Sequence, residues 1–160
     1  MSRSGVNASV GMAIFLGATA MLFAALLLAY AILRTQAPGW PPGGGAHLPR
    51  ALLGANTLVL AAASLALRRR PAGALALAIA FAALQALAWR TALGAGLGPA
   101  SGVYASIFFA LSGLHALHLG GGIVALAVVV ARGERPRLVT RYFDFMLAVW
   151  VVIYVAVCLR

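Results

Sequence analysis

Long apolar stretches alternate with short charged or Gly/Pro-rich segments along the whole sequence. Cutting the chain at its charges and Gly/Pro clusters leaves five apolar segments, at 10–33, 51–67, 72–89, 103–131 and 142–159. Each has about 17 residues or more, which at about 1.5 Å per residue crosses or nearly crosses a hydrocarbon layer about 30 Å thick. Backbone amides in lipid must bond within their own segment, and no period-two alternation favours a barrel. The predicted fold is therefore all-α, an integral membrane bundle of five transmembrane helices.

The connections between these segments are short, which predicts a single transmembrane domain over residues 1–160. The longest connection runs from Arg34 to Arg50 and contains four prolines and a run of three glycines. Such a stretch is predicted to be non-helical. The first apolar segment is longer than the core of a signal peptide and no hydrophilic mature domain follows it, so we expect it to be retained.

The composition agrees with a lipid environment. Hydrophobic residues make up 64% of the chain and charged residues 9%, whereas a soluble domain has about 45 to 50% apolar and about 25% charged residues. All 12 basic residues are arginine and the two acids are Glu134 and Asp144, which gives a net charge of +10. The arginines lie between apolar segments and form no patch with interleaved aromatics, so we interpret them as interfacial anchors and expect no nucleic-acid partner.

The arginines also predict an orientation, because short cytoplasmic loops of membrane proteins are enriched in Lys and Arg. If the N-terminus is cytoplasmic, that side holds eight arginines: Arg3, Arg68, Arg69, Arg70, Arg132, Arg135, Arg137 and Arg141. The other side holds four: Arg34, Arg50, Arg90 and Arg160. The sequence therefore predicts a multi-pass protein of the bacterial inner membrane with its N-terminus inside and its C-terminus outside.

Residues that carry chemistry are scarce, with three histidines, two acids, one cysteine and no lysine. His47 falls in the outer loop, which leaves His115 and His118 as the only intramembrane imidazoles. They are three positions apart on one helix, about 60° around its axis, and cannot supply the two opposite axial ligands of one haem. The single Cys158 excludes an intrachain disulfide and a Cys-based metal site. We expect no cofactor in this chain, and the lack of midplane acids weighs against a proton-coupled transporter.

Several polar positions within the apolar segments predict helix packing. Ser112, Ala116 and Gly120 recur every four residues, a small-residue stripe that lets another backbone approach closely. His115 and His118 flank this stripe, and we interpret them as hydrogen-bonded packing residues that face protein.

Asp144 and Trp150 belong to the last apolar segment. Asp144 is expected two residues into its helix, beside Arg141, where a carboxylate complements the helix N-terminus near the interface. Trp150 is expected in the middle of the same helix, where its indole N–H requires a partner within the bundle. Both residues are therefore predicted to have structural roles.

The stretch from Tyr104 to Gly122 resembles the signature of subunit III of the haem-copper oxidases. The family pattern is a Tyr, a Ser-Ile-Phe-Phe core, Gly-Leu-His-x-Leu-His and a Gly pair, and the matching residues are Tyr104, Ser106, Ile107, Phe108, Phe109, Gly113, Leu114, His115, His118, Gly121 and Gly122. Three further stretches agree in order and spacing: Phe15 to Phe23 continuing to Tyr30 and Arg34; Trp40 to Pro42 with Leu48, Pro49, Asn56, Thr57 and Ser64; and Tyr142 to Phe145 through Trp150. The resemblance covers essentially the whole chain.

This resemblance implies the five-helix form of the family, found in quinol oxidases and some cytochrome c oxidases. Such a chain is a non-catalytic subunit that stabilises subunit I of an aerobic respiratory complex reducing O2 to water. The oxidoreductase active site, with its haem and copper, is then expected in partner subunits, and phospholipids are expected around this chain. The sequence departs from the family at its intramembrane carboxylates, with Thr19, Ala88 and Leu147 at positions where an acid is usual. A proton-uptake role is therefore not carried over.

Two alternatives remain open at this point. One is the related subunit of a nitric oxide reductase complex, and the other is a small membrane transporter or channel. The candidate residues for subunit packing or lipid contact are Thr19, Asn56, Tyr104, Phe108, Ser112, His115, Ala116, His118, Gly120, Asp144 and Trp150.

Overall fold

The computed structural model describes residues 3–37, 48–134 and 137–159. Most of the connection predicted to be non-helical, with Trp40 and His47, lies outside these residues, as does Arg135. The described residues form five α-helices: α1 (Arg3–Gln36), α2 (Arg50–Ala66), α3 (Pro71–Gly94), α4 (Val103–Ala131) and α5 (Arg137–Ile153), and a π-helical turn, Tyr154–Leu159, continues α5. The prediction of an all-helical fold with five helices is confirmed.

The helix ends follow from local backbone chemistry. Pro71 is the first residue of α3, where its missing N–H leaves no hydrogen bond unmade. After α3 and α4 the chain turns at Gly96 and Gly133, whose φ angles of +82° and +64° are left-handed. In both turns the next residue donates its N–H back into the last helical turn, from Leu97 to the Ala92 carbonyl and from Glu134 to that of Val129.

Three helices extend beyond the predicted apolar segments. α1 runs from Arg3 to Gln36 and so includes the first three residues of the connection predicted to be non-helical. α3 continues past Trp89 to Gly94, and α5 begins at Arg137, whereas 142 was the predicted start. Arginine is a good helix former, and its long side chain carries the charge into the interface while the backbone stays helical. Cutting the sequence at charges therefore placed these ends too far inside the helices.

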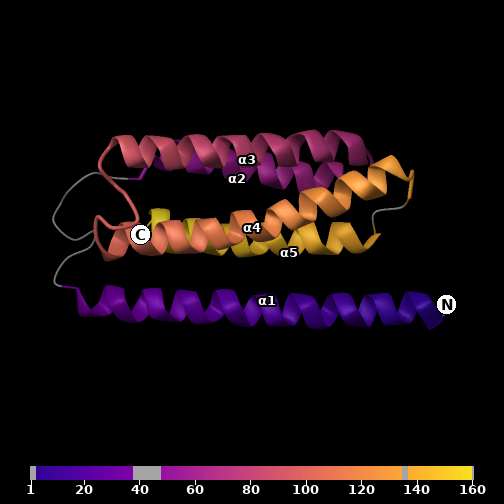
Figure 1. Ribbon diagram of the computed structural model, residues 1–160, viewed down its shortest axis with the longest axis horizontal. Helices are drawn as coiled ribbons and strands as arrows, with labels where there is room; N and C mark the ends of the chain where they lie inside the picture. The colour runs from indigo at the N-terminus through magenta and orange to yellow at the C-terminus, as the bar shows by residue number, and fades with distance from the viewer. Residues whose placement is uncertain (1–2, 38–47, 135–136, 160) are drawn as a thin grey trace.

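The helices lie side by side as an elongated bundle (Figure 1). α2 packs against α3, α4 packs against α5, and these two pairs contact each other through α3 with α4 and α2 with α5. α1 lies along the outside of the bundle and contacts α4 and α5. The N-terminal end of α1, the turn between α2 and α3, and the start of α5 lie at the same end of the molecule.

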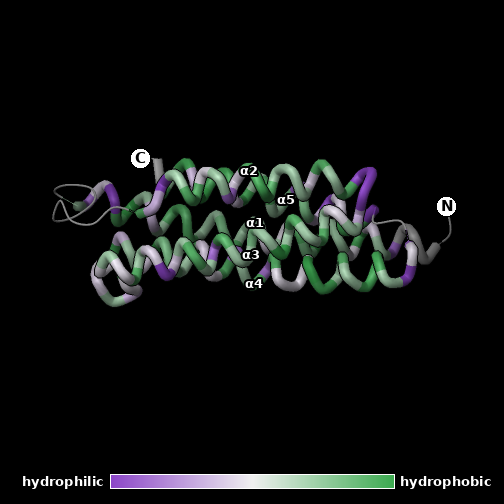
Figure 2. Tube along the Cα trace, turned by 90° about the horizontal axis from the view of Figure 1, so that it is seen from above, coloured by the Kyte–Doolittle hydropathy of each residue, from purple (hydrophilic) through white to green (hydrophobic). Residues whose placement is uncertain are grey.

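Four helices are long and apolar enough to cross a membrane: α1, α3, α4, and α5 taken together with its π-helical continuation as Arg137–Val157. α2 has 17 residues and is therefore about 26 Å long; it lies along α3 in the same bundle (Figures 1 and 2). Hydropathy is high along the helices, and the most hydrophilic residues gather toward the two ends of the bundle (Figure 2). This is the distribution expected of a protein whose middle lies in lipid.

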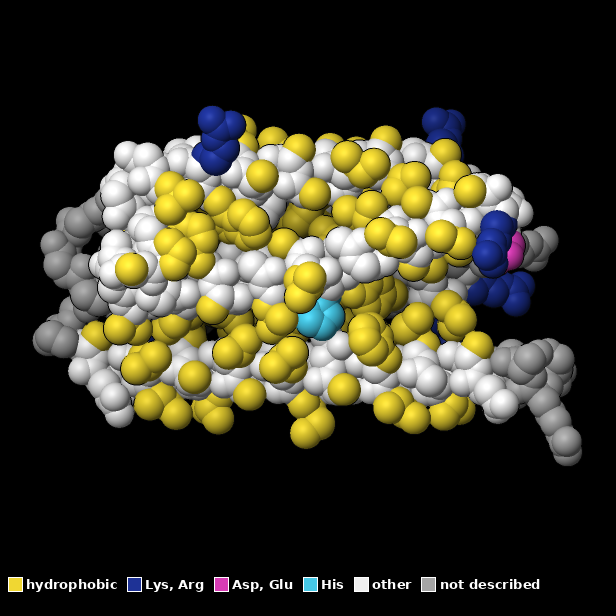
Figure 3. All heavy atoms as spheres, viewed as in Figure 1, with side chains coloured by type: hydrophobic (Ala, Val, Ile, Leu, Met, Phe, Trp, Pro, Cys, Tyr) yellow, Lys and Arg dark blue, Asp and Glu magenta, His cyan; other side chains and the backbone are white. Residues whose placement is uncertain are grey.

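The outer surface is apolar as well as the core. α1 exposes Ile14, Met21 and Leu28, seven residues apart, with exposed fractions of 68%, 75% and 63%. Figure 3 shows hydrophobic side chains across the middle of one face and arginine side chains toward its ends. In water such an apolar surface would promote aggregation, whereas in a membrane it faces lipid acyl chains.

Candidate functional site

The polar side chains inside the bundle join helices to one another. Asn56 of α2 donates from Nδ2 to Oε1 of Gln85 on α3, at 3.0 Å, and both side chains are buried. The turn at 68–70 makes α2 and α3 antiparallel neighbours, which brings these two positions level. After this bond, Asn56 Oδ1 and Gln85 Nε2 have no hydrogen-bond partner among the described residues. A buried polar atom without a partner is costly, so a further hydrogen-bonding group beside either of these atoms would be stabilising.

His115 lies at the centre of the bundle, fully buried among aromatic rings. Its ring centroid is 4.9 Å from that of Trp150, 5.9 Å from that of Phe81 and 6.3 Å from that of Phe23. These neighbours come from α5, α3 and α1, so His115 on α4 contacts three other helices. Neither ring nitrogen has a hydrogen-bond partner among the described residues, which differs from the hydrogen-bonded packing role predicted for His115.

Trp150 and Trp89 each join two helices through the indole N–H. Trp150 Nε1 donates to Oγ1 of Thr57 on α2 at 2.9 Å, and Trp89 Nε1 on α3 donates to Oγ of Ser112 on α4 at 3.0 Å. The partner expected for Trp150 is thus a threonine of α2. A tryptophan near a helix end is also typical of the membrane interface, so the sequence gives no signal that Trp89 bonds to a second helix.

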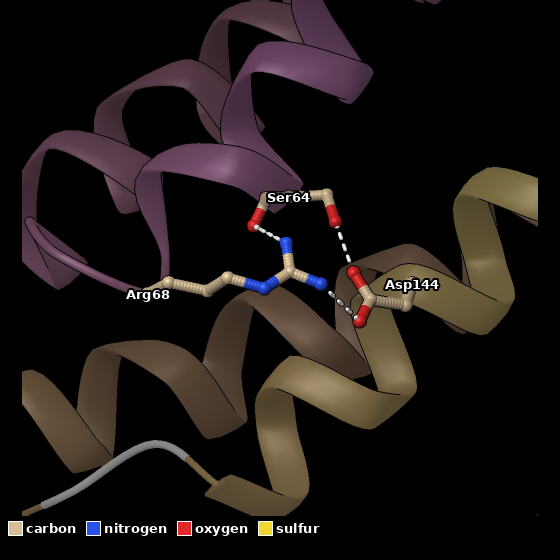
Figure 4. A network of polar contacts seen from close by, with 3 residues as sticks. All are labelled: Ser64, Arg68 and Asp144. Carbon is tan, nitrogen blue, oxygen red and sulfur yellow. Dashed lines mark hydrogen bonds and ion pairs between the residues drawn. The ribbon is translucent and has the colours of Figure 1, made fainter.

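Asp144 is held differently from the prediction. Because α5 begins at Arg137, Asp144 lies seven residues into the helix, and its partners are Ser64 of α2 and Arg68 of the turn after it rather than the neighbouring Arg141 (Figure 4). Arg68 Nη2 is 2.8 Å from Asp144 Oδ2, and Ser64 Oγ donates to Asp144 Oδ1. Arg68 also donates to the Ser64 carbonyl at 3.3 Å. This network fixes the last turn of α2 to α5 at the arginine-rich end of the bundle.

The small-residue stripe on α4 does not seat a close helix within this chain. Ser112 is fully buried, but a Cβ added at Gly120 would meet no described atom within 4 Å. Ala116 and Gly120 instead line a cavity of about 210 Å³ between α3 and α4. The close approach is made at Gly122, where a Cβ would lie 2.6 Å from the Tyr142 ring of α5. The spacing of small residues predicts where helices can approach, but which of these positions is filled depends on the tilt of α3 and α5.

His118 and Thr19 lie where α1 meets α4. His118 Nδ1 is 2.9 Å from the Leu114 carbonyl of its own helix, and its ring is 5.6 Å from that of Phe23 on α1. His118 also lines a cavity of about 400 Å³ with Phe15 and Tyr142, and the Tyr142 hydroxyl donates to the His118 carbonyl at 2.7 Å. Thr19 is buried and donates to the Phe15 carbonyl.

The remaining candidates, Tyr104 and Phe108, are buried near the start of α4, where the Phe108 ring meets the Phe109 ring edge-on. The structure thus brings Asn56, Ser112, His115 and Trp150 into the core that joins α2, α3, α4 and α5, and places Asp144 and His118 at its edges. Sequence reasoning did not single out Gln85, Thr57, Trp89 or Arg68 as partners. Each is a common residue type whose role appears only through the helix that faces it.

The two intramembrane histidines do not form a common ligand site. His115 is enclosed by rings, and His118 turns its Nδ1 toward its own helix. Among the described residues, no group of three or more His, Cys, Asp or Glu side chains is arranged to hold a metal ion. The site is therefore a set of interhelix contacts rather than a ligand cage.

Comparison with known proteins gives the relatives of this chain. It is 27% identical over 175 residues to "Cytochrome c oxidase subunit 3" of Synechocystis sp., which covers 93% of the chain and 74% of that protein. It is 28% identical over 175 residues to "Probable cytochrome c oxidase subunit 3" of Mycobacterium leprae, covering 93% of the chain and 86% of that protein. It is 26% identical over 180 residues to "Cytochrome bo(3) ubiquinol oxidase subunit 3" of Pseudomonas aeruginosa, covering 98% and 86%. No protein-family model matches the chain.

The chain is similar to proteins named oxidase subunit 3 over about 93% of its length, at 25–28% identity. The similarity extends over nearly the whole chain and confirms the predicted resemblance to subunit III. Together with the long apolar helices, it indicates a multi-pass bacterial membrane protein.

Proposed function

We propose that this chain is the non-catalytic subunit III of a bacterial haem-copper terminal oxidase. It binds subunit I within the membrane and stabilises it during turnover, in an aerobic complex that reduces O2 to water. The haem and copper of the complex belong to partner subunits. The observation that carries this proposal is the similarity to subunit 3 of both cytochrome c and ubiquinol oxidases over at least 93% of the chain.

The internal contacts support a structural role. Asn56 and Trp150 donate hydrogen bonds to neighbouring helices, Ser112 accepts one from Trp89, and His115 is enclosed by three rings. A transporter needs intramembrane polar groups that reach its solute, whereas these groups hold the bundle together. Annular phospholipids complete the environment, with acyl chains covering exposed residues such as Met21 of α1.

The deciding experiment follows oxidase activity against time in the purified complex with and without this chain. We expect the initial turnover to be largely kept after removal and the activity to decay several-fold faster, because a supporting subunit acts on stability rather than on chemistry. A parallel arm measures solute flux by the isolated chain in liposomes. Flux from the chain alone, with an oxidase that is indifferent to its removal, would overturn the proposal in favour of a transporter.

The proposed orientation places the N-terminus in the cytoplasm. It rests on the eight-to-four distribution of arginines between the two sides of the membrane. In a variant with the native thiol removed by Cys158→Ser, a membrane-impermeant maleimide added outside should label Ala46→Cys and leave Glu134→Cys unlabelled. Labelling of Glu134→Cys alone would reverse the orientation.

A further inference from the structure

An open groove lies between α3 and α4 in the membrane-spanning part of the bundle. Its cavity of about 210 Å³ is bounded by Gln85 and Trp89 on α3 and by Ala116 and Gly120 on α4. The two helices are joined at one end of this groove, where Trp89 bonds to Ser112. Beyond this bond no described side chain fills the space beside Gly120. α1 lies against α4 and α5 instead, so it leaves this groove uncovered.

Gln85 gives the groove wall an unpaired hydrogen-bonding atom. The residue is 1% exposed, its Oε1 accepts from Asn56, and its Nε2 has no hydrogen-bond partner among the described residues. Exchanging oxygen and nitrogen in both carboxamides keeps the bond between them and leaves the Gln85 oxygen without a partner instead. Because an unpaired buried polar atom is costly, an occupant that brings a hydrogen-bonding group is favoured over one that is purely apolar.

The depth of Gln85 decides what kind of molecule can bring that group. Gln85 lies fourteen residues after Pro71 and five before Arg90, one of the arginines expected on the outer side, or about 21 Å and about 8 Å from these two positions along α3. This places it inside the hydrocarbon layer, on the side nearer Arg90. The ester and phosphate oxygens of a phospholipid lie at the interface, and water is scarce below it. A protein group is therefore the partner that fits.

The α4 wall of the groove suits the close approach of a helix. It includes the small residues Ala116 and Gly120, and a Cβ added at Gly120 would meet no described atom within 4 Å. Small residues on a transmembrane helix allow a second backbone to come close enough for hydrogen bonds across the interface. The groove thus combines an unpaired hydrogen-bonding atom, open space and a backbone that a second helix can approach.

We propose that the α3–α4 groove seats a transmembrane helix of another oxidase subunit, and that this helix presents a hydroxyl or carboxamide group, which can both donate and accept, to the unpaired end of the Gln85 carboxamide. This inference rests on the proposed function and goes further by naming the contact face. It also accounts for a small-residue stripe that the chain itself leaves open.

The first test uses the intact oxidase complex with a photo-reactive p-benzoylphenylalanine in place of Ile123, which lines the groove. We expect a cross-link to a membrane-spanning peptide of another oxidase subunit, identified by mass spectrometry. The matched control places the probe at Leu28, which is 63% exposed on α1, and should label lipid. If Ile123 labels only lipid or a second copy of this chain while the oxidase subunits co-purify, the groove assignment is wrong and the proposed function stands. If no oxidase subunit co-purifies, both fail.

The second test separates assembly from folding. Gly120→Leu has room within this chain, so the isolated variant should keep its helix content and thermal midpoint. In the complex the same side chain would push two helices apart, and overpacking of that size corresponds to a loss of about tenfold or more in recovered partner subunits. The control Val124→Leu, at a residue 63% exposed on the same helix, should assemble normally. Normal assembly of Gly120→Leu would exclude a helix from this groove.

Discussion

Glycines on two sides of α4 have different surroundings. On the side facing α5, Gly122 lies directly against the Tyr142 ring, with Phe143 next to it, and the contact is closed. On the side bordering α3, Gly120 is two residues away in sequence and faces an open groove. Successive residues are about 100° apart on a helix, so the two glycines point in widely different directions.

The difference teaches that a glycine in a membrane helix can serve either the chain's own fold or its assembly. Gly122 is required by the fold because no side chain fits there. The fold does not require glycine at position 120, so the absence of a side chain there matters for contacts with other molecules. Four substitutions test this division, and the expected effects decrease from the first to the last.

Replacing Gly122 with alanine should have the largest effect. The new Cβ would lie 2.6 Å from the Tyr142 ring, and that ring is held by the bond from its hydroxyl to the His118 carbonyl. Relieving such an overlap shifts α5 and costs about 1 to 3 kcal/mol. Thermal unfolding of the purified chain in mild detergent, followed by circular dichroism, measures the loss. An unchanged midpoint would show that the α4–α5 contact is looser than the structure has it.

Trp150→Phe tests the contact between α5 and α2 in the centre of the bundle. The change removes the hydrogen bond to Thr57 and should lower the free energy of unfolding by about 0.5 to 1.5 kcal/mol. Thr57→Val removes the other partner, and the double variant completes a cycle. If the bond is what matters, the effects of the two single changes should not add. Full additivity would mean that Trp150 acts through ring packing with Phe81 and His115 and not through the bond to Thr57.

Asp144→Asn weakens the contact of α5 with the C-terminal end of α2. The substitution removes the ion pair with Arg68, whose side chains are 50% and 39% exposed, so solvent screening limits the loss to about 0.2 to 1 kcal/mol. The difference from the wild type should shrink as salt is raised. Glu134→Gln is the control, since Glu134 and Arg132 are 3.9 Å apart and more exposed. A salt-independent loss would assign the role of Asp144 to its bond with Ser64.

Gly120→Ala should have the smallest effect on the isolated chain, and of the opposite sign. No described atom lies within 4 Å of the new methyl group, and alanine is favoured over glycine within a helix by about 0.5 to 1 kcal/mol. The same change at two glycines of one helix should thus destabilise at Gly122 and leave unchanged or stabilise at Gly120. The unfolding assay used for Gly122→Ala applies here too. A clear destabilisation by Gly120→Ala would mean that the groove is closed within the chain.

The helical fold could be predicted from the sequence because lipid leaves few choices. Backbone amides must bond within each apolar segment, so length and hydropathy fix both the type and the number of elements. The helix ends were less predictable: α5 starts at Arg137 because arginine does not end a helix at an interface. For the same reason Asp144 lies deeper than expected, where it reaches Arg68 rather than Arg141.

The sequence by itself determined that this chain is an apolar five-helix bundle with few ionisable or metal-binding residues. Its motif around His115 and His118 indicated the similarity to oxidase subunit III. Only the tertiary structure decided which polar residues meet, because Asn56 with Gln85, Trp89 with Ser112 and Trp150 with Thr57 pair across helices. Sequence spacing describes one helix face at a time, whereas these pairs depend on the tilt and rotation of two helices. Helix tilt and rotation also leave Gly120 beside an open groove and bring Tyr142 against Gly122. Neither arrangement can be predicted from the spacing of residues in the sequence.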